Sequence, residues 1–345
     1  MLKSHNLMLK ATLVSADARL DALRAWLNDE LACDYTLAPA SADASFRRYF
    51  RITTADGTRI AMDAPPPRED CRPFIRVATL MHEAGVNVPR VLAQDVERGF
   101  LLLTDLGTTT YLRALTPENA DALFSDAIDA LITWQCASRP DVLPPYDEAL
   151  LRREMQLLPE WYIARHLQFT LPEDLQRDLD EAMTCIVRVN LAQPSVYVHR
   201  DYMPRNLMLS EPNPGVLDFQ DAVYGPITYD VVSLFRDAFL SWDEERVIDW
   251  AVRYWERARR AGLPVDRDFG SFYRDFEWMG LQRHLKVLGI FARINYRDGK
   301  PDYLADTPRF VRYVRAVGER YGELQGLMRV FDALEQRAPQ VGYTF

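Results

Sequence analysis

The most informative part of the chain joins two apolar runs, each of which ends in polar side chains. Residues 196–206 read VYVHRDYMPRN, and Asp218 follows Asn206 twelve residues later within GVLDFQD. Between the runs NLML and GVLDF lies SEPNP, a turn-rich sequence that predicts an antiparallel hairpin. Asn206 opens the first strand of this hairpin and Asp218 closes the second. We therefore expect their side chains to meet at the end away from the turn.

Asp201 lies only five residues before Asn206, on the loop that enters the same end of the hairpin. Two carboxylates and an amide make an oxygen-rich site that suits Mg²⁺. Phosphoryl transfer requires such a metal site, together with a carboxylate that accepts the proton of the attacking hydroxyl. Pro204 restricts the residue before it and stiffens the loop. The alternative is an ordinary loop, because Asp, Asn and Pro all favour turns.

The string HRDYMPRN, residues 199–206, resembles the catalytic loop of the protein-kinase-like fold. Its proline, two residues before the asparagine, is similar to the aminoglycoside phosphotransferase and choline kinase branch. VLDFQD resembles the metal-binding segment of that branch, and GPITYDV the start of the next helix. The resemblance implies ATP as phosphoryl donor, Asp201 as catalytic base, and Asn206 and Asp218 as Mg²⁺ ligands. It also implies that His199 and Asp230 brace the loop; Asp230 could instead be a helix N-terminal carboxylate.

Three longer segments narrow the resemblance within this family. SADASFRRYFR, IAMDAPPP and residues 278–304 resemble bacterial kinases that phosphorylate the anomeric C1 hydroxyl of N-acetylmuramate and N-acetylglucosamine in peptidoglycan sugar recycling. One alternative is a kinase of another alcohol, such as an aminoglycoside or choline, which the arginine-rich segment 283–297 disfavours. The other is a non-catalytic pseudokinase, against which the intact set Asp201, Asn206 and Asp218 argues.

The nucleotide-binding residues are harder to predict, because two signals of protein kinases are missing. Residues 41–51 contain no glycine, and no lysine occurs between residues 11 and 285. Small residues in the first segment would let backbone N–H groups approach phosphate, and its arginines suit phosphate as paired donors. The candidates are Ser45, Phe46, Arg47 and Arg48, together with Thr104, Asp105 and Leu106 in a connector that resembles the adenine-binding hinge. The alternatives are an exposed strand face and a plain turn. We expect Glu69 to be solvated.

The acceptor-binding residues are expected on the predicted helix 270–296. Arg283 and Arg293 lie on one face of this helix, and Glu277 and His284 lie along another. A cationic side chain there would bind the lactyl carboxylate of a muramic acid. The alternative is a solvated charged stripe beside core aromatic residues.

Hydrophobic periodicity predicts a small β-rich lobe followed by a large helical lobe, and the resemblance implies that they form an α+β, two-lobed protein-kinase-like fold. A small antiparallel sheet is expected in residues 1–107, with hairpins around Ala-Asp-Gly and residues 97–99. A mainly helical lobe is expected in residues 108–345. The predicted helices are 16–32, 73–85, 117–137, 147–167, 173–190, 228–240, 243–261, 270–296 and 308–336.

Length and composition set the class of protein. A chain of 345 residues is longer than one compact hydrophobic core usually holds, so two lobes or domains are expected. Its net charge of −9 argues against partners such as nucleic acid or an anionic membrane. The four cysteines are widely separated and predict neither zinc nor disulfide chemistry. No run of about 18 apolar residues occurs. We therefore expect a cytoplasmic monomer whose ligands are a nucleotide and a small sugar.

Overall fold

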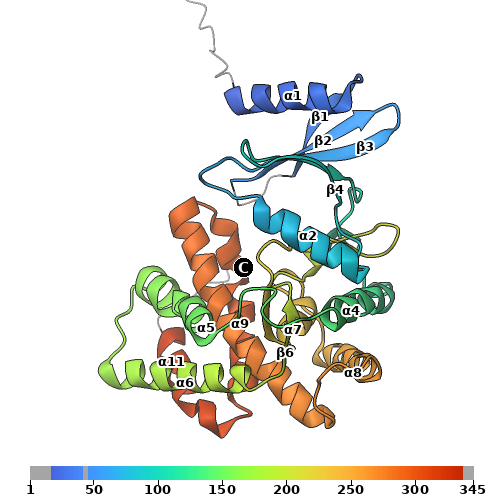
Figure 1. Cartoon of the computed structure of the whole chain (residues 1–345). Coiled ribbons are helices and arrows are strands. Elements are labelled where there is room, and N and C mark those ends of the chain that lie inside the picture. The colour runs from blue at the N-terminus through green and yellow to red at the C-terminus, as the bar shows by residue number, and fades with distance from the viewer. Residues whose placement is uncertain (1–16, 42–45, 337–345) are drawn as a thin grey trace, which may run out of the picture. The chain divides into compact units, whose positions relative to one another are not determined.

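The structure is a computed structural model that describes residues 17–41 and 46–336, and this part of the chain divides into two compact units (Figure 1). The first unit contains the described residues up to Arg72 together with Val91–Asp105. The second contains Pro73–Arg90 and the described residues from Leu106 onward. The division after Asp105 lies close to the predicted boundary at residue 107. The predicted first lobe also included the segment Pro73–Arg90, which the structure assigns to the second unit.

The first unit is built on a sheet that has five strands within the described residues, in the order β1-β2-β3-β5-β4, with every pair antiparallel. The strands are β1 (Thr36–Ser41), β2 (Arg48–Thr54), β3 (Gly57–Asp63), β4 (Val91–Asp95) and β5 (Phe100–Thr104). Both predicted hairpins, β2–β3 and β4–β5, are confirmed. Gly57 has a φ of 125°, which side-chain-bearing residues rarely adopt, so the Asp-Gly turn depends on glycine. Strand β1 was not predicted, because its sequence TLAPAS contains proline and little β-branched character.

Helix α1 (Ala18–Leu31) covers the apolar side of this sheet, as the first unit in Figure 1 shows. It begins at Asp17, whose carboxylate accepts a hydrogen bond from the Leu20 N–H at 3.0 Å. Its buried side chains Leu23, Trp26 and Leu27 pack with Phe50, Ile52, Ala61, Phe100 and Leu102 of the sheet. Each large apolar side chain buried in this way contributes about 1.5–3 kcal/mol. The helical prediction for residues 16–32 is thus confirmed over the described residues.

The second unit is mainly helical. Its α-helices in the described residues are α2 (Arg72–Ala84, of which Arg72 belongs to the first unit), α3 (Tyr111–Ala114), α4 (Ala120–Cys136), α5 (Glu148–Met155), α6 (Glu173–Leu191), α7 (Tyr229–Phe235), α8 (Glu244–Arg260), α9 (Phe269–Asp298), α10 (Thr307–Gly318) and α11 (Gln325–Glu335). A π-helix, η1 (Leu158–His166), and three short 3₁₀ segments, η2 (Pro204–Asn206), η3 (Pro301–Asp306) and η4 (Gly322–Leu324), join them. The predicted helices therefore exist, but several of their boundaries differ.

Three predicted helices are shorter or broken, each for a local reason. The span 147–167 divides into α5 and η1, because Pro159 at the start of η1 has no N–H to continue the α-helical ladder. The span 308–336 is interrupted before η4, which begins with Gly322. The span 228–240 ends at Phe235, since the Asp237 carboxylate accepts the N–H groups of Phe239 and Leu240 and forms a turn.

The long helix α9 is the core element of the second unit. It packs against α5, η1, α6, α7 and α10, and most of its residues from Phe276 to Ala292 are buried. Two short strand pairs lie in the same unit: β6 (Ser195–Val198) with β9 (Val223–Pro226), and β7 (Leu207–Met208) with β8 (Gly215–Val216). These pairs carry the segment with the predicted site.

None of the helices within the described residues combines the length and the hydropathy that crossing a membrane requires.

Candidate active site

The β7–β8 hairpin brings the Asn206 and Asp218 side chains together at the end where the loop of Asp201 enters. Leu207 pairs with Val216 across the hairpin, and the Leu217 N–H donates to the Asn206 carbonyl at 2.9 Å. The Asn206 amide nitrogen lies 2.9 Å from the Asp201 carbonyl oxygen and 3.4 Å from a carboxylate oxygen of Asp218. Within the second unit, the Asn206 and Asp218 side chains therefore meet, and the Asp201 backbone lies beside them.

The Asn206 amide is oriented by the loop that precedes it. Because its nitrogen donates to the Asp201 carbonyl, its oxygen points away from that carbonyl. Asp218 has a left-handed φ of 63°, and its other carboxylate oxygen accepts from the Gln220 amide at 2.8 Å. Gln220 was not among the predicted site residues, although the motif Asp-Phe-Gln-Asp contains it.

The donor set of Asn206 and Asp218 fits Mg²⁺. One carboxylate and one amide oxygen are hard ligands, and Mg²⁺ takes few protein ligands while keeping water and substrate phosphates. No group of three or more His, Cys, Asp or Glu side chains that could hold a metal occurs within residues 17–41 and 46–336. This arrangement therefore suits a cation that arrives with a phosphorylated ligand better than a resident transition metal.

His199 connects the loop to the strand that carries Asp218. Its ring is fully buried; its Nε2 donates to the Leu217 carbonyl at 3.0 Å, and its Nδ1 accepts from the Asp201 N–H at 3.2 Å. Burial lowers the pKa of His199 to about 4, although the nearby Asp201 carboxylate opposes this shift. The imidazole is neutral at physiological pH, so one tautomer can make both hydrogen bonds.

Asp230, at the start of α7, holds the backbone of the same turn. Its two carboxylate oxygens accept the N–H of His199 at 2.6 Å and the N–H of Arg200 at 3.0 Å. Burial raises the pKa of Asp230 to about 7, while these two hydrogen bonds act in the opposite direction. The predicted proximity of Asp230 to the loop is therefore observed in the geometry.

Arg200 has backbone strain that the surrounding structure must compensate. Its φ is 77°, a conformation that costs a residue with a Cβ of the order of 1–3 kcal/mol. Its carbonyl accepts from Arg283 Nη1 at 3.2 Å, and its guanidinium donates to Glu154 at 2.6 Å. Sequence reasoning assigned no role to Arg200 and did not detect Glu154, which lies in a helix with no motif around it.

The nucleotide candidates of the first unit are engaged in ion pairs. Arg47 donates to Glu69 at 3.0 Å. Arg48 donates to Asp63 at 2.6 Å and also to Asp17. Glu69 is mostly buried, so the expectation that it is solvated is wrong. Its carboxylate is held by the Arg47 guanidinium and by the Phe46 N–H.

The remaining nucleotide candidates differ in how they are placed. Phe46 is 57% exposed, with the Arg68 guanidinium over its ring. Thr104 ends β5, and the Asp105 carboxylate accepts two hydrogen bonds from Arg51 at 2.6 and 3.1 Å. Leu106 begins the second unit, and Ser45 lies outside the described residues.

The four acceptor candidates on α9 lie in different environments. Glu277 is buried, and its carboxylate accepts hydrogen bonds from Arg320 and from the Tyr321 hydroxyl at 2.6 Å. His284 is also buried and is stacked on Tyr313. Both side chains are part of the helical packing and are not displayed on a surface.

The two arginines among these candidates also differ from each other. Arg283 is buried and stacks over the Tyr229 ring, with its guanidinium 4.6 Å from the ring centre. Arg293 is partly exposed, and its Nε is buried without a hydrogen-bond partner in the described part of the chain. Arg283 alone of the four reaches the loop that carries Asp201, through the Arg200 carbonyl.

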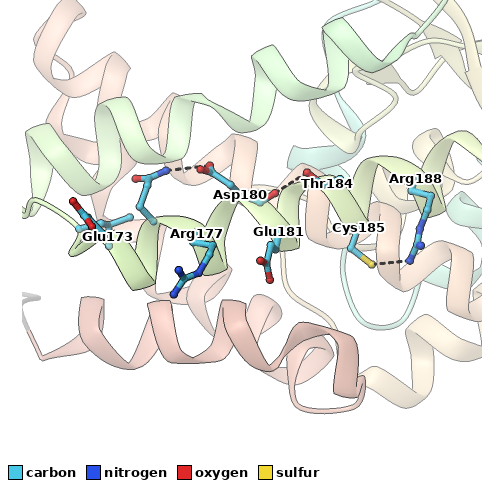
Figure 2. Close-up of a pocket in the computed structure, with 9 residues that line it drawn as sticks. Glu173, Arg177, Asp180, Glu181, Thr184, Cys185 and Arg188 are labelled. Carbon is cyan, nitrogen blue, oxygen red and sulfur yellow. Dashed lines mark hydrogen bonds between the residues drawn. The ribbon is translucent and has the colours of Figure 1, made fainter.

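A cavity of about 690 Å³ lies along one side of α6, as Figure 2 shows. Its lining residues are Leu171, Glu173, Gln176, Arg177, Asp180, Glu181, Thr184, Cys185 and Arg188. None of them belongs to the segment 199–237 that contains the converging polar side chains. The cavity and the candidate active site are therefore separate features.

Known proteins that are similar to this chain define its family. Residues 36–269 match the profile of the Phosphotransferase enzyme family. The chain belongs to this family, and the predicted α+β, protein-kinase-like fold is confirmed. The solved structure of choline kinase LicA from Streptococcus pneumoniae shares this fold, with a TM-score of 0.61 at 12% identity over 86% of this chain and 99% of the choline kinase.

Two curated relatives are similar over nearly their whole length. The chain is 54% identical over 336 residues to a protein of Pseudomonas aeruginosa named N-acetylmuramate/N-acetylglucosamine kinase, an alignment that covers 94% of this chain and 99% of the relative. It is 49% identical over 318 residues to the protein of the same name from Neisseria meningitidis serogroup B, covering 90% of this chain and 95% of that relative. The chain is therefore a kinase-class phosphotransferase.

Proposed function

We propose that this protein is an ATP-dependent kinase that phosphorylates the anomeric C1 hydroxyl of N-acetylmuramate or N-acetylglucosamine. The observation that carries the proposal is the convergence of Asp201, Asn206 and Asp218 at one end of the β7–β8 hairpin. The choice of sugar is supported by the 54% identity to the kinase of Pseudomonas aeruginosa that is named for these two substrates. A cytoplasmic location is part of the proposal, since ATP and recycled sugars meet there.

In this proposal Asp201 accepts the proton of the sugar hydroxyl as its oxygen attacks the γ-phosphate. The neutral His199 and the carboxylate of Asp230 hold the turn around Asp201, so the base does not have to reorient during the reaction. Asn206 and Asp218 would hold Mg²⁺, which supplies charge neutralisation for the nucleotide phosphates. The neighbouring amide of Gln220 fixes one oxygen of Asp218.

The nucleotide contacts in our proposal come from Ser45, Phe46, Arg47 and Arg48, and from the connector Thr104, Asp105 and Leu106. Arg47 is the strongest arginine candidate to replace the missing lysine, because a mostly buried Glu69 pairs with it. Such a pair resembles in chemistry the lysine–glutamate pair of protein kinases. Arg48 is a weaker candidate, since two carboxylates, Asp63 and Asp17, already take its guanidinium.

For the acceptor we propose contacts from the cationic side chains Arg283 and Arg293. Arg283 reaches the carbonyl of Arg200, one residue from the proposed base. Arg293 is partly exposed, so its guanidinium can donate to a sugar oxygen or carboxylate. Glu277 and His284 would act only indirectly, because both are buried in the helical packing.

The test is a panel of amino sugars incubated with the purified protein and Mg-ATP, with products resolved by phosphorus NMR. The proposal predicts a C1 phosphate of N-acetylmuramate or N-acetylglucosamine. A C6 phosphate, or transfer to choline or an aminoglycoside alone, would refute it. Nucleotide binding in a thermal-shift assay without turnover on any acceptor would instead establish the pseudokinase alternative.

A further inference from the structure

Glu154 on α5 is a buried carboxylate for which the proposed reaction has no use. Four hydrogen-bond donors surround it, from Arg200 at 2.6 Å, Lys286 at 2.8 Å, Gln282 at 3.1 Å and the Tyr146 hydroxyl. Its side chain is 8% exposed. A buried carboxylate with this many donors is fixed in position, because moving it would leave several buried polar groups unpaired.

Two of the donors are cations, and they keep Glu154 ionised. Burial alone would raise the pKa of Glu154, but Lys286 and Arg200 lower it to about 2. The carboxylate is therefore negative at neutral pH. Within the described residues, Glu154 pairs with both the Arg200 guanidinium and the Lys286 ammonium.

Arg200 is the residue through which Glu154 reaches the proposed base. It precedes Asp201 directly, and its left-handed φ of 77° sets the direction in which the chain enters Asp201. Four hydrogen bonds hold it: its N–H donates to Asp230, its carbonyl accepts from Arg283, and its guanidinium donates to Glu154 and, at 3.4 Å, to the Asp221 carbonyl. A strained residue of this kind persists only when its surroundings over-determine it.

These contacts also join elements that are distant in the sequence. Glu154 belongs to α5, while Lys286, Gln282 and Arg283 belong to α9, which packs against α5. Arg200 lies in the loop after β6. All three elements belong to the second unit, in which Figure 1 labels α5, α9 and β6. The carboxylate is the point at which α5, α9 and the Asp201 loop share hydrogen bonds.

We propose that Glu154 is a positioning residue for phosphoryl transfer, which acts through the Arg200 guanidinium to hold Asp201 in its productive orientation. The proposal rests on the proposed function, because it takes Asp201 as the base. This role differs from that of an ion pair that only joins α5 to α9. A structural pair would change stability alone, whereas a positioning residue changes turnover of the folded enzyme.

The test compares Glu154→Gln with wild type in the full-length protein. Steady-state kinetics on the folded fraction should show kcat reduced by about 10- to 100-fold, the loss expected when a reacting group is misplaced by about 1 Å. The KM for Mg-ATP should stay within about twofold. Gln282→Met is the matched control, since it removes another donor from the same carboxylate and leaves the Glu154–Arg200 bond intact. Its kcat should stay within about twofold of wild type.

A second variant keeps the proposal testable if Glu154→Gln does not fold, because that change leaves two cations without a counter-charge. The double variant Glu154→Gln/Lys286→Met removes one cation together with the anion. Its kcat should be about 10- to 100-fold below that of Lys286→Met. A folded Glu154→Gln or double variant with undiminished kcat would overturn the inference, and so would an equal loss in Gln282→Met.

Failure of this inference can be told apart from failure of the proposed function. Wild-type turnover on the amino-sugar panel reports on the function alone. Hydrolysis of Mg-ATP by water, measured without any sugar, gives a second kcat for each variant that does not depend on the acceptor. The inference predicts that the kcat values of the variants fall in the same order in both assays. An order of kcat values that simply follows the melting temperatures would contradict it.

Discussion

Replacing Asp230 by Asn separates what this carboxylate does for stability from what it does for the Asp201 loop. Both oxygens of Asp230 accept backbone N–H groups, from His199 at 2.6 Å and Arg200 at 3.0 Å. An Asn side chain can accept only one of these hydrogen bonds, and its amide group would face the other N–H. We expect the left-handed turn at Arg200 to loosen and kcat to fall by about 100-fold.

The effect of Asp230→Asn on the free energy of unfolding should depend on pH. Burial raises the pKa of Asp230 from 3.8 to about 7, which corresponds to about 4 kcal/mol at 1.36 kcal/mol per pKa unit. Between these two values the folded state binds more protons than the unfolded state. The free energy of unfolding therefore falls as pH rises from about 4 to about 7. Asn carries no charge and removes this loss, so the stability of the variant relative to wild type should rise with pH.

The assay is urea unfolding of both proteins at pH 5 and pH 8, together with kcat at saturating substrates. The free energy of unfolding of Asp230→Asn, relative to wild type, should increase by up to about 4 kcal/mol as pH rises from about 4 to 8, so the pH 5 and pH 8 pair captures only part of it. Asp275→Asn is a matched control, because burial raises the pKa of Asp275 to about 6 at a site without contact to the loop. Its kcat should be unchanged. A pH-independent difference in stability, or full activity of Asp230→Asn, would refute this reasoning.

Three further variants test other parts of the site. Asp218→Asn should raise the Mg²⁺ concentration that gives half-maximal rate by at least about tenfold, because Mg²⁺ loses its carboxylate ligand; a Mg²⁺ titration of the rate that is unchanged would count against this assignment. His199→Gln should remove a loss of stability that wild type shows at acid pH. Because the pKa of His199 is lowered from 6.5 to about 4, the free energy of unfolding of wild type should fall by about 3 kcal/mol relative to the variant between pH 7 and pH 4. Urea unfolding across that range measures this difference, and parallel pH curves would argue against a neutral buried imidazole. Glu277→Gln should lower the free energy of unfolding by about 1–3 kcal/mol, because the partners Arg320 and Tyr321 lose an ionised acceptor. Its acceptor KM should remain the same, and a large increase would show that Glu277 contacts the sugar.

Local sequence patterns were sufficient for the part of the site that a single hairpin creates. The turn SEPNP and the apolar runs on either side predict that Asn206 and Asp218 meet, and the β7–β8 pair confirms it. The Asp-Gly turn likewise predicted β2 and β3. In both cases the residues in contact are fewer than twenty positions apart, so turn chemistry and strand alternation decide the outcome.

Contacts between distant segments could not be predicted in this way. Glu154 lies 46 residues before Arg200 and 132 before Lys286, and no motif marks it. The pairing of Arg47 with Glu69 depends on how the loop after β3 returns to β2, which periodicity does not specify. Glu277 and His284 were placed on polar stripes of α9, but this helix is surrounded by other elements, so stripes that look solvated in sequence are buried.

The most direct test of the proposed phosphoryl transfer is the kcat of Asp201→Asn with Mg-ATP and the sugar that wild type phosphorylates. Loss of the base should reduce kcat by about 10²- to 10⁴-fold, while the melting temperature and its increase on adding Mg-ATP stay close to those of wild type. A correctly folded Asp201→Asn protein that transfers phosphate at the wild-type rate would contradict the role given to this aspartate.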